Sequence, residues 1–65
     1  MNLKAKYNAI LNKNRRAEIR RQLAEVFGVS EPTIFAWLGG RLNPPKRNYA
    51  AIAEIMGEPV ETLFP

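Results

Sequence analysis

The sequence predicts an all-α fold, a compact bundle of five short helices that forms one domain over residues 1–65. Apolar residues recur at helical spacing in successive stretches of the chain. Asparagine, glycine or proline separates each stretch from the next, and these residues commonly begin or end helices. Because 65 residues can build only one small core, every stretch is expected to contribute to it.

The first two helices follow from apolar residues at positions i, i+4, i+7 and i+8. This pattern predicts a first helix over residues 3–12. Its inner face comprises Leu3, Tyr7, Ile10 and Leu11. Asn14 is the expected N-cap of a second helix over residues 15–27, and Gly28 is expected to end that helix with a positive φ. The inner face of the second helix comprises Ile19, Leu23, Val26 and Phe27.

The chain from Ser30 onward predicts a third helix that begins near Glu31. Ser30 is expected to cap it by accepting a hydrogen bond from the Thr33 amide. Pro32 fits the first turn, where its missing N–H removes no intrahelical bond. The inner face comprises Ile34, Trp37 and Leu38, and a glycine pair at residues 39–40 ends the helix. Two short helices joined by a tight turn predict a helix-turn-helix over residues 20–40.

The remaining chain predicts a stiff loop and two further helices. Two prolines restrict the loop over residues 41–47. The inner face of the fourth helix comprises Tyr49, Ile52, Ala53 and Met56. Gly57 is expected to end this helix, and Pro59 to open a short fifth one. The fifth helix returns Val60, Leu63 and Phe64 to the core.

Charge is distributed unevenly along the chain. Ten basic and three acidic residues give residues 1–50 a net charge of +7, whereas residues 51–65 carry three glutamates and no base. A basic surface attracts the phosphates of nucleic acids. The alternatives are a solvated basic face and attraction to an acidic membrane surface, although no apolar run is long enough to span a bilayer.

Four arginines near the start of the second helix oppose its dipole. They are Arg15, Arg16, Arg20 and Arg21. A phosphate placed nearby would relieve the repulsion, and the alternative is that these are ordinary surface arginines.

The composition argues against catalysis. The chain has no His, Cys or Asp, its only serine is the expected cap, and its carboxylates are six dispersed glutamates. We therefore expect neither an enzyme nor a metal site, and no cofactor or small-molecule ligand is indicated. The N-terminus lacks a signal peptide, and the absence of cysteine fits a reducing compartment, so we expect a cytoplasmic protein.

Seven residues occupy the small, turn and core positions of a known family at that family's spacing. They are Ala24, Gly28, Val29, Ser30, Ile34, Trp37 and Gly40. The chain resembles the lambda-repressor-like (Cro/phage-repressor, or XRE-type) helix-turn-helix DNA-binding domains. Residues 52–64 look like the closing helices of that family, so the resemblance covers about residues 15–65. It implies sequence-preferring binding to double-stranded DNA by a small transcriptional regulator of bacterial or phage type.

The resemblance implies that the third helix, at about residues 31–38, lies in the major groove. The implied base readers are Glu31, Pro32, Thr33, Phe35 and Ala36. The implied contacts to the DNA backbone are Arg20, Arg21, Ser30, Arg41, Lys46 and Arg47, the last three of which could instead be solvated loop charges. Because one small module makes few base contacts, we also expect a homodimer on a two-fold site.

The chemistry of the implied readers limits what they can recognise. Glu31 can only accept hydrogen bonds, so its base partner is the cytosine N4 amino group. The alternative is that its negative charge only stabilises the N-terminus of the helix. Phe35 and Ala36 can offer only apolar contact, most suitably to thymine methyl groups. Because Gln, Asn and Arg are missing from this face, we expect modest specificity or a contribution from DNA shape.

Two other functions compete with DNA binding. The first is a protein-interaction module on the same fold, such as an antitoxin-like protein or a regulator subunit, which Glu31 and an apolar patch at Phe35 and Leu38 favour. The second is single-stranded RNA binding, which ranks behind because Phe35 and Tyr49 do not form an exposed aromatic platform.

Overall fold

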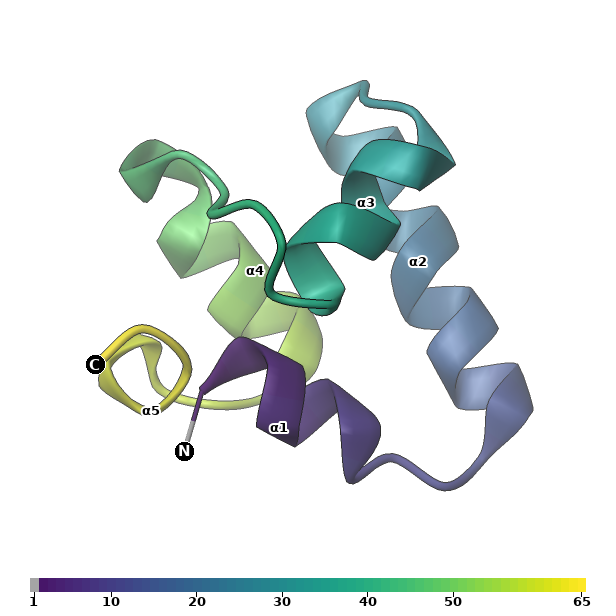
Figure 1. The fold of residues 1–65 in the computed structure, drawn as a ribbon, viewed down its shortest axis with the longest axis horizontal. Coiled ribbons are helices and arrows are strands. Elements are labelled where there is room, and N and C mark those ends of the chain that lie inside the picture. The colour runs from purple at the N-terminus through teal and green to yellow at the C-terminus, as the bar shows by residue number, and fades with distance from the viewer. Residues whose placement is uncertain (1) are drawn as a thin grey trace.

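The computed structural model describes residues 2–65, which form five α-helices, one short 3-10 helix and no strand (Figure 1). The elements are α1 (Leu3–Asn8), α2 (Lys13–Phe27), α3 (Glu31–Leu38), η1 (Lys46–Asn48), α4 (Tyr49–Met56) and α5 (Val60–Leu63). The predicted all-α class and the five predicted helices are therefore confirmed for this part of the chain. None of the helices in residues 2–65 has the length and apolar character needed to cross a membrane.

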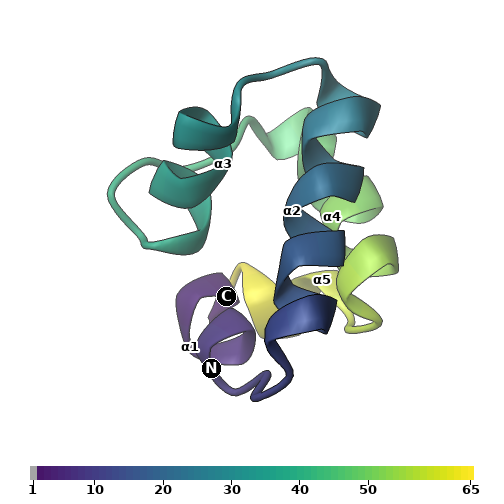
Figure 2. The ribbon, with the colours of Figure 1, turned by 90° about the vertical axis from the view of Figure 1, so that its right-hand side faces the viewer.

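The five α-helices enclose one core (Figures 1 and 2). α2 packs against α3 and α4, while α1 packs against α3 and α5. The most deeply buried side chains are Ile19, Leu23, Ile34, Ile52 and Leu63. Phe27 and Trp37 meet edge to face with ring centroids 5.8 Å apart, and Tyr49 stacks on Phe64 with centroids 3.7 Å apart. Since α1 adds Leu3 and Tyr7, every α-helix contributes to the core.

α1 ends at Asn8, earlier than the sequence predicted. Arg16 of α2 lies at this end, where its Nε donates a hydrogen bond to the carbonyl of Ile10 at 2.6 Å and its Nη2 donates to that of Asn8 at 3.5 Å. A guanidinium can thus satisfy carbonyls that the end of a helix leaves without amide partners. Leu11 lies beyond the helix and is 86% exposed, so its predicted burial is wrong.

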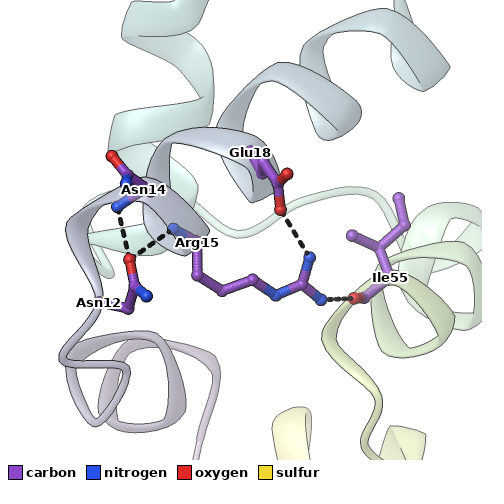
Figure 3. A network of polar contacts seen from close by, with 5 residues as sticks. All are labelled: Asn12, Asn14, Arg15, Glu18 and Ile55. Atoms are coloured by element: carbon purple, nitrogen blue, oxygen red, sulfur yellow. Dashed lines mark hydrogen bonds and ion pairs between the residues drawn. The ribbon is translucent and has the colours of Figure 1, made fainter.

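α2 begins at Lys13, and its N-cap is Asn12 rather than the predicted Asn14. Figure 3 shows why: Asn12 Oδ1 accepts hydrogen bonds from the backbone amides of Asn14 and Arg15, at 2.9 and 3.2 Å. The Arg15 side chain extends across to Glu18 at 3.4 Å and to the carbonyl of Ile55 in α4 at 3.5 Å. Arg15, like Arg16, therefore donates a hydrogen bond to a carbonyl near the end of a neighbouring helix.

Glycines end the helices as predicted. Gly28 after α2 and Gly57 after α4 have φ values of 63° and 72°, in the left-handed region that favours glycine. After α3, Gly40 has a φ of 79°, and the amide of Arg41 donates to the carbonyl of Ala36 at 2.9 Å. This hydrogen bond turns the chain back over the end of α3, as in a Schellman motif.

Val26 and Ser30 differ from their predicted roles. Val26 is exposed, because the apolar period gives the side of a helix but not how far along it the neighbouring helices extend. Ser30 is the N-cap of α3 by position, but its side chain accepts no hydrogen bond from the Thr33 amide. The two hydroxyl groups of Ser30 and Thr33 lie 3.1 Å apart and pair with each other instead.

Candidate functional site

α3 carries its exposed side chains opposite the core. Glu31, Pro32 and Phe35 are exposed, and Thr33 is half-buried. The predicted inner residues are all buried: Ile34, Trp37 and Leu38. From α2, two arginines line an open recess together with Glu31. We call the outer surface formed by Arg20, Arg21, Glu31, Pro32 and Phe35 the α3 surface.

Ala36 does not belong to this surface, which corrects its place among the predicted base readers. Its exposed fraction is 8%. The amides of Arg41 and Leu42 donate to its carbonyl at 2.9 and 3.2 Å, so the chain folds back beside it after α3. A methyl group with so little exposed area can make almost no apolar contact with a thymine methyl group.

Arg20 is held on two sides by neighbouring helices. Its Nη1 donates a hydrogen bond of 2.6 Å to the hydroxyl of Tyr7 in α1. Its guanidinium carbon lies 4.9 Å from the ring centroid of Phe35 in α3, within the range of a cation–π contact. Its Nε is buried and finds no acceptor among the described residues. One arginine of α2 therefore connects α1 with α3.

Acidic side chains lie next to the basic ones. Glu18, Glu25 and Glu31 line an open recess of about 650 Å³ between α2 and α3, which Arg21 also borders. These are all the acidic residues of positions 1–50. Coulomb repulsion therefore disfavours a phosphate at this recess. Glu18 and Glu31 also line the recess of Arg20 and Arg21, but there two arginines offset the two glutamates, so the repulsion of an anion is smaller.

Arg21 and Ser30 are the remaining predicted contacts near α3. Both are exposed. The Ser30 hydroxyl is paired with that of Thr33, and either oxygen can donate to the other. A ligand at Ser30 would therefore meet two hydroxyl groups that share one hydrogen bond.

The three predicted contacts after α3 are exposed: Arg41, Lys46 and Arg47. Arg41 follows the end of α3, and its amide bond to Ala36 keeps the backbone there beside the helix. Lys46 and Arg47 lie in η1, where Lys46 lines a recess with Tyr49. In Figure 1 the connection from the end of α3 crosses to η1, which packs at the start of α4. Arg41 therefore lies next to the end of α3, whereas Lys46 and Arg47 lie in η1, which packs against α4.

Tyr7 is the one residue of this region that the sequence did not single out, except as core. The ring is buried, and its hydroxyl meets Arg20, which is thirteen positions away. A tyrosine in an otherwise apolar stripe indicates a polar contact inside the fold, since buried hydroxyl groups need polar partners. The identity of that partner depends on how α1 packs against α2.

No protein-family model, curated protein or solved structure matches this chain. Within residues 2–65, no three His, Cys, Asp or Glu side chains are placed to hold a metal ion.

Proposed function

We propose that this protein binds double-stranded DNA, without catalysis, as a small transcriptional regulator of bacterial or phage type that acts in the cytoplasm. In this proposal α2 and α3 act as a helix-turn-helix, with α3 in the major groove and α2 across the DNA backbone. The observation that carries the proposal is the α3 surface: exposed Glu31, Pro32 and Phe35 lie on the same side as two arginines of α2, while the opposite face of α3 is buried.

The junction between the two helices supports this proposal. Residues 28–30 connect α2 directly to α3, and Gly28 takes the left-handed conformation there. The two helices pack against each other, so α2 supports α3 from behind. The N-terminal turn of α3 remains exposed, and this is the part of a recognition helix that contacts base edges.

Four side chains of the α3 surface have roles that their chemistry permits. Glu31 accepts a hydrogen bond from a cytosine N4 amino group, and Phe35 contacts a thymine methyl group. Arg20 and Arg21 bind phosphates, and Arg41 does so beside the end of α3. Since no Gln, Asn or Arg projects from the exposed face of α3, we propose modest base specificity with a contribution from DNA shape.

We further propose that two copies bind one two-fold site. A single α3 can contact only a few base pairs, which is too little for a stable operator complex. Sedimentation velocity with a DNA duplex of the selected sequence should give two protein copies per duplex. One copy per duplex at saturating protein would contradict the dimer and leave DNA binding itself intact.

The test of DNA binding is selection from a random-duplex pool, with sequencing of the retained DNA. The protein should enrich a sequence motif, and the double substitution Arg20→Ala/Phe35→Ala should abolish the enrichment. Leu11→Ala is the matched control, since Leu11 is exposed outside the α3 surface, and it should enrich the same motif. Salt-sensitive retention without enrichment would reduce the proposal to backbone binding, and no retention at low salt would refute it.

A protein-interaction module is the second candidate. Two observations favour it: Phe35 is 46% exposed, and three glutamates line the neighbouring recess. An exposed aromatic ring beside carboxylates suits an apolar and basic protein surface. The size of the ionic strength dependence separates the candidates, because DNA binding weakens steeply with salt whereas a protein interface centred on the apolar Phe35 ring weakens much less.

A further inference from the structure

We infer that Tyr7 is a positioning residue of the α3 surface, whose hydroxyl holds the Arg20 guanidinium against Phe35 so that Arg20 meets a DNA phosphate in an ordered conformation. The inference rests on the proposed function. It adds a residue of α1, which lies outside the two helices that form the α3 surface.

The position of the Tyr7 hydroxyl is set by the core. The ring is buried, with 7% of the residue exposed. The guanidinium carbon of Arg16 lies 5.8 Å from the ring centroid, and Arg16 is itself bound to the carbonyl of Ile10. The tyrosine is therefore held by packing that does not involve Arg20, and its hydroxyl can act as a fixed point for that arginine.

Arg20 is held by two contacts, and its Nε is buried. The Tyr7 hydroxyl accepts its Nη1 hydrogen bond at 2.6 Å, the Phe35 ring lies 4.9 Å from its guanidinium carbon, and its Nε is turned into the protein. A guanidinium has five N–H donors, and the bond to Tyr7 uses one of them. Arg20 also lines the open recess shared with Arg21, so it borders solvent. Its remaining Nη donors can bind one phosphate, for which the arginine fork is suited.

This arrangement matters for affinity because arginine is a flexible side chain. An unrestrained arginine loses rotamer freedom when it binds a phosphate, and an arginine that is already held loses less. Removing the Tyr7 hydroxyl should therefore weaken DNA binding through Arg20, although the hydroxyl itself touches no DNA.

A double-mutant cycle tests this coupling. Tyr7→Phe retains the buried ring and should lower affinity for the selected duplex about 3- to 10-fold. In the Arg20→Ala background the same substitution should change affinity by less than about 2-fold. The salt slope should be unchanged in Tyr7→Phe, which keeps the arginine charge, and should fall by about 0.9 in Arg20→Ala, which loses one phosphate contact. Tyr49→Phe, at a tyrosine stacked on Phe64, is the matched control and should leave affinity unchanged.

A second measurement does not require DNA. The Phe35 ring current should shift the side-chain proton resonances of Arg20 in the NMR spectrum of the free protein. This shift should disappear in Phe35→Leu and decrease in Tyr7→Phe, while circular dichroism shows that both variants are folded.

The outcomes separate this inference from the proposed function. The wild-type protein could bind DNA while Tyr7→Phe lowers affinity equally in the wild-type and Arg20→Ala backgrounds. This result would show that Tyr7 acts only through the fold, and the inference would be wrong. Wild-type affinity in Tyr7→Phe, or an undiminished Arg20 shift, would also overturn the inference and leave DNA binding standing. No binding by the wild-type protein at low salt would overturn both.

Discussion

Replacing Asn12 by alanine is expected to lower the free energy of unfolding by about 1 kcal/mol. Asn12 Oδ1 accepts hydrogen bonds from the amides of Asn14 and Arg15 at 2.9 and 3.2 Å (Figure 3). These amides belong to the first turn of α2, where no helical carbonyl can satisfy them. Both bonds are exposed, so water partly replaces them and the loss stays well below that of a buried pair. In a domain of this size the change corresponds to a fall in Tm of about 4–8 °C.

Urea unfolding followed by circular dichroism measures this change, with two variants as controls. Asn14→Ala should leave stability unchanged or raise it by up to about 0.7 kcal/mol, because Asn14 lies inside the first turn of α2, where alanine is the better helix former. Asn12→Asp should retain stability, since it keeps an acceptor and adds a negative charge at the helix N-terminus. A larger loss in Asn14→Ala than in Asn12→Ala would show that the helix is capped at Asn14 and that the assignment to Asn12 is wrong.

Three further predictions concern the core, a turn and the charged surface. Ile34→Ala should lower the free energy of unfolding by about 2–5 kcal/mol because Ile34 is fully buried, whereas Phe35→Ala should lower it by less than about 1 kcal/mol. Equal losses in denaturant unfolding would contradict the assigned faces of α3. Gly28→Ala should lower the free energy of unfolding by about 1–2 kcal/mol through the φ of 63° alone, because an added Cβ meets no atom within 4 Å. Gly28→Asn should lower it less, as measured by thermal melts. An unchanged Tm for Gly28→Ala would argue against the left-handed turn. For DNA binding, Arg21→Ala should reduce the slope of log Kobs against log salt by about 0.9. Lys6→Ala, which removes an ion pair with Glu58, should leave this slope unchanged. Equal slopes for the two variants would place Arg21 away from the phosphates.

Part of the fold could be predicted because it depends on local backbone preferences. The apolar periods located all five helices, and Gly28 and Gly57 marked two helix ends, where the structure gives them positive φ values. The inner face of α3 was also predictable, since Trp37 and its apolar neighbours occupy one side of a regular helix. These features involve residues within a few positions of one another, so the sequence carries their physical cause directly.

The candidate site could be predicted only in part. Glu31 and Phe35 are exposed as predicted, since a helix that buries one face presents the other to solvent. Ala36 is not exposed, because the chain after α3 returns beside it. DNA binding stays a prediction that rests on the chemistry of the α3 surface, and dimerisation stays one that rests on the few base pairs a single α3 can contact.

The sequence by itself determined the five helices, the glycines at the ends of α2, α3 and α4, and the exposure of Glu31, Pro32 and Phe35. Only the tertiary structure decided which surfaces other elements cover and which polar groups meet. Leu11 and Val26 carry apolar side chains in helical phase, yet no neighbouring element covers them. Arg20 meets both the Tyr7 hydroxyl and the Phe35 ring because three helices converge on it. Local periodicity sets the direction of a side chain along its own helix, whereas its partners depend on distances between helices, and these are set by the packing of the whole core.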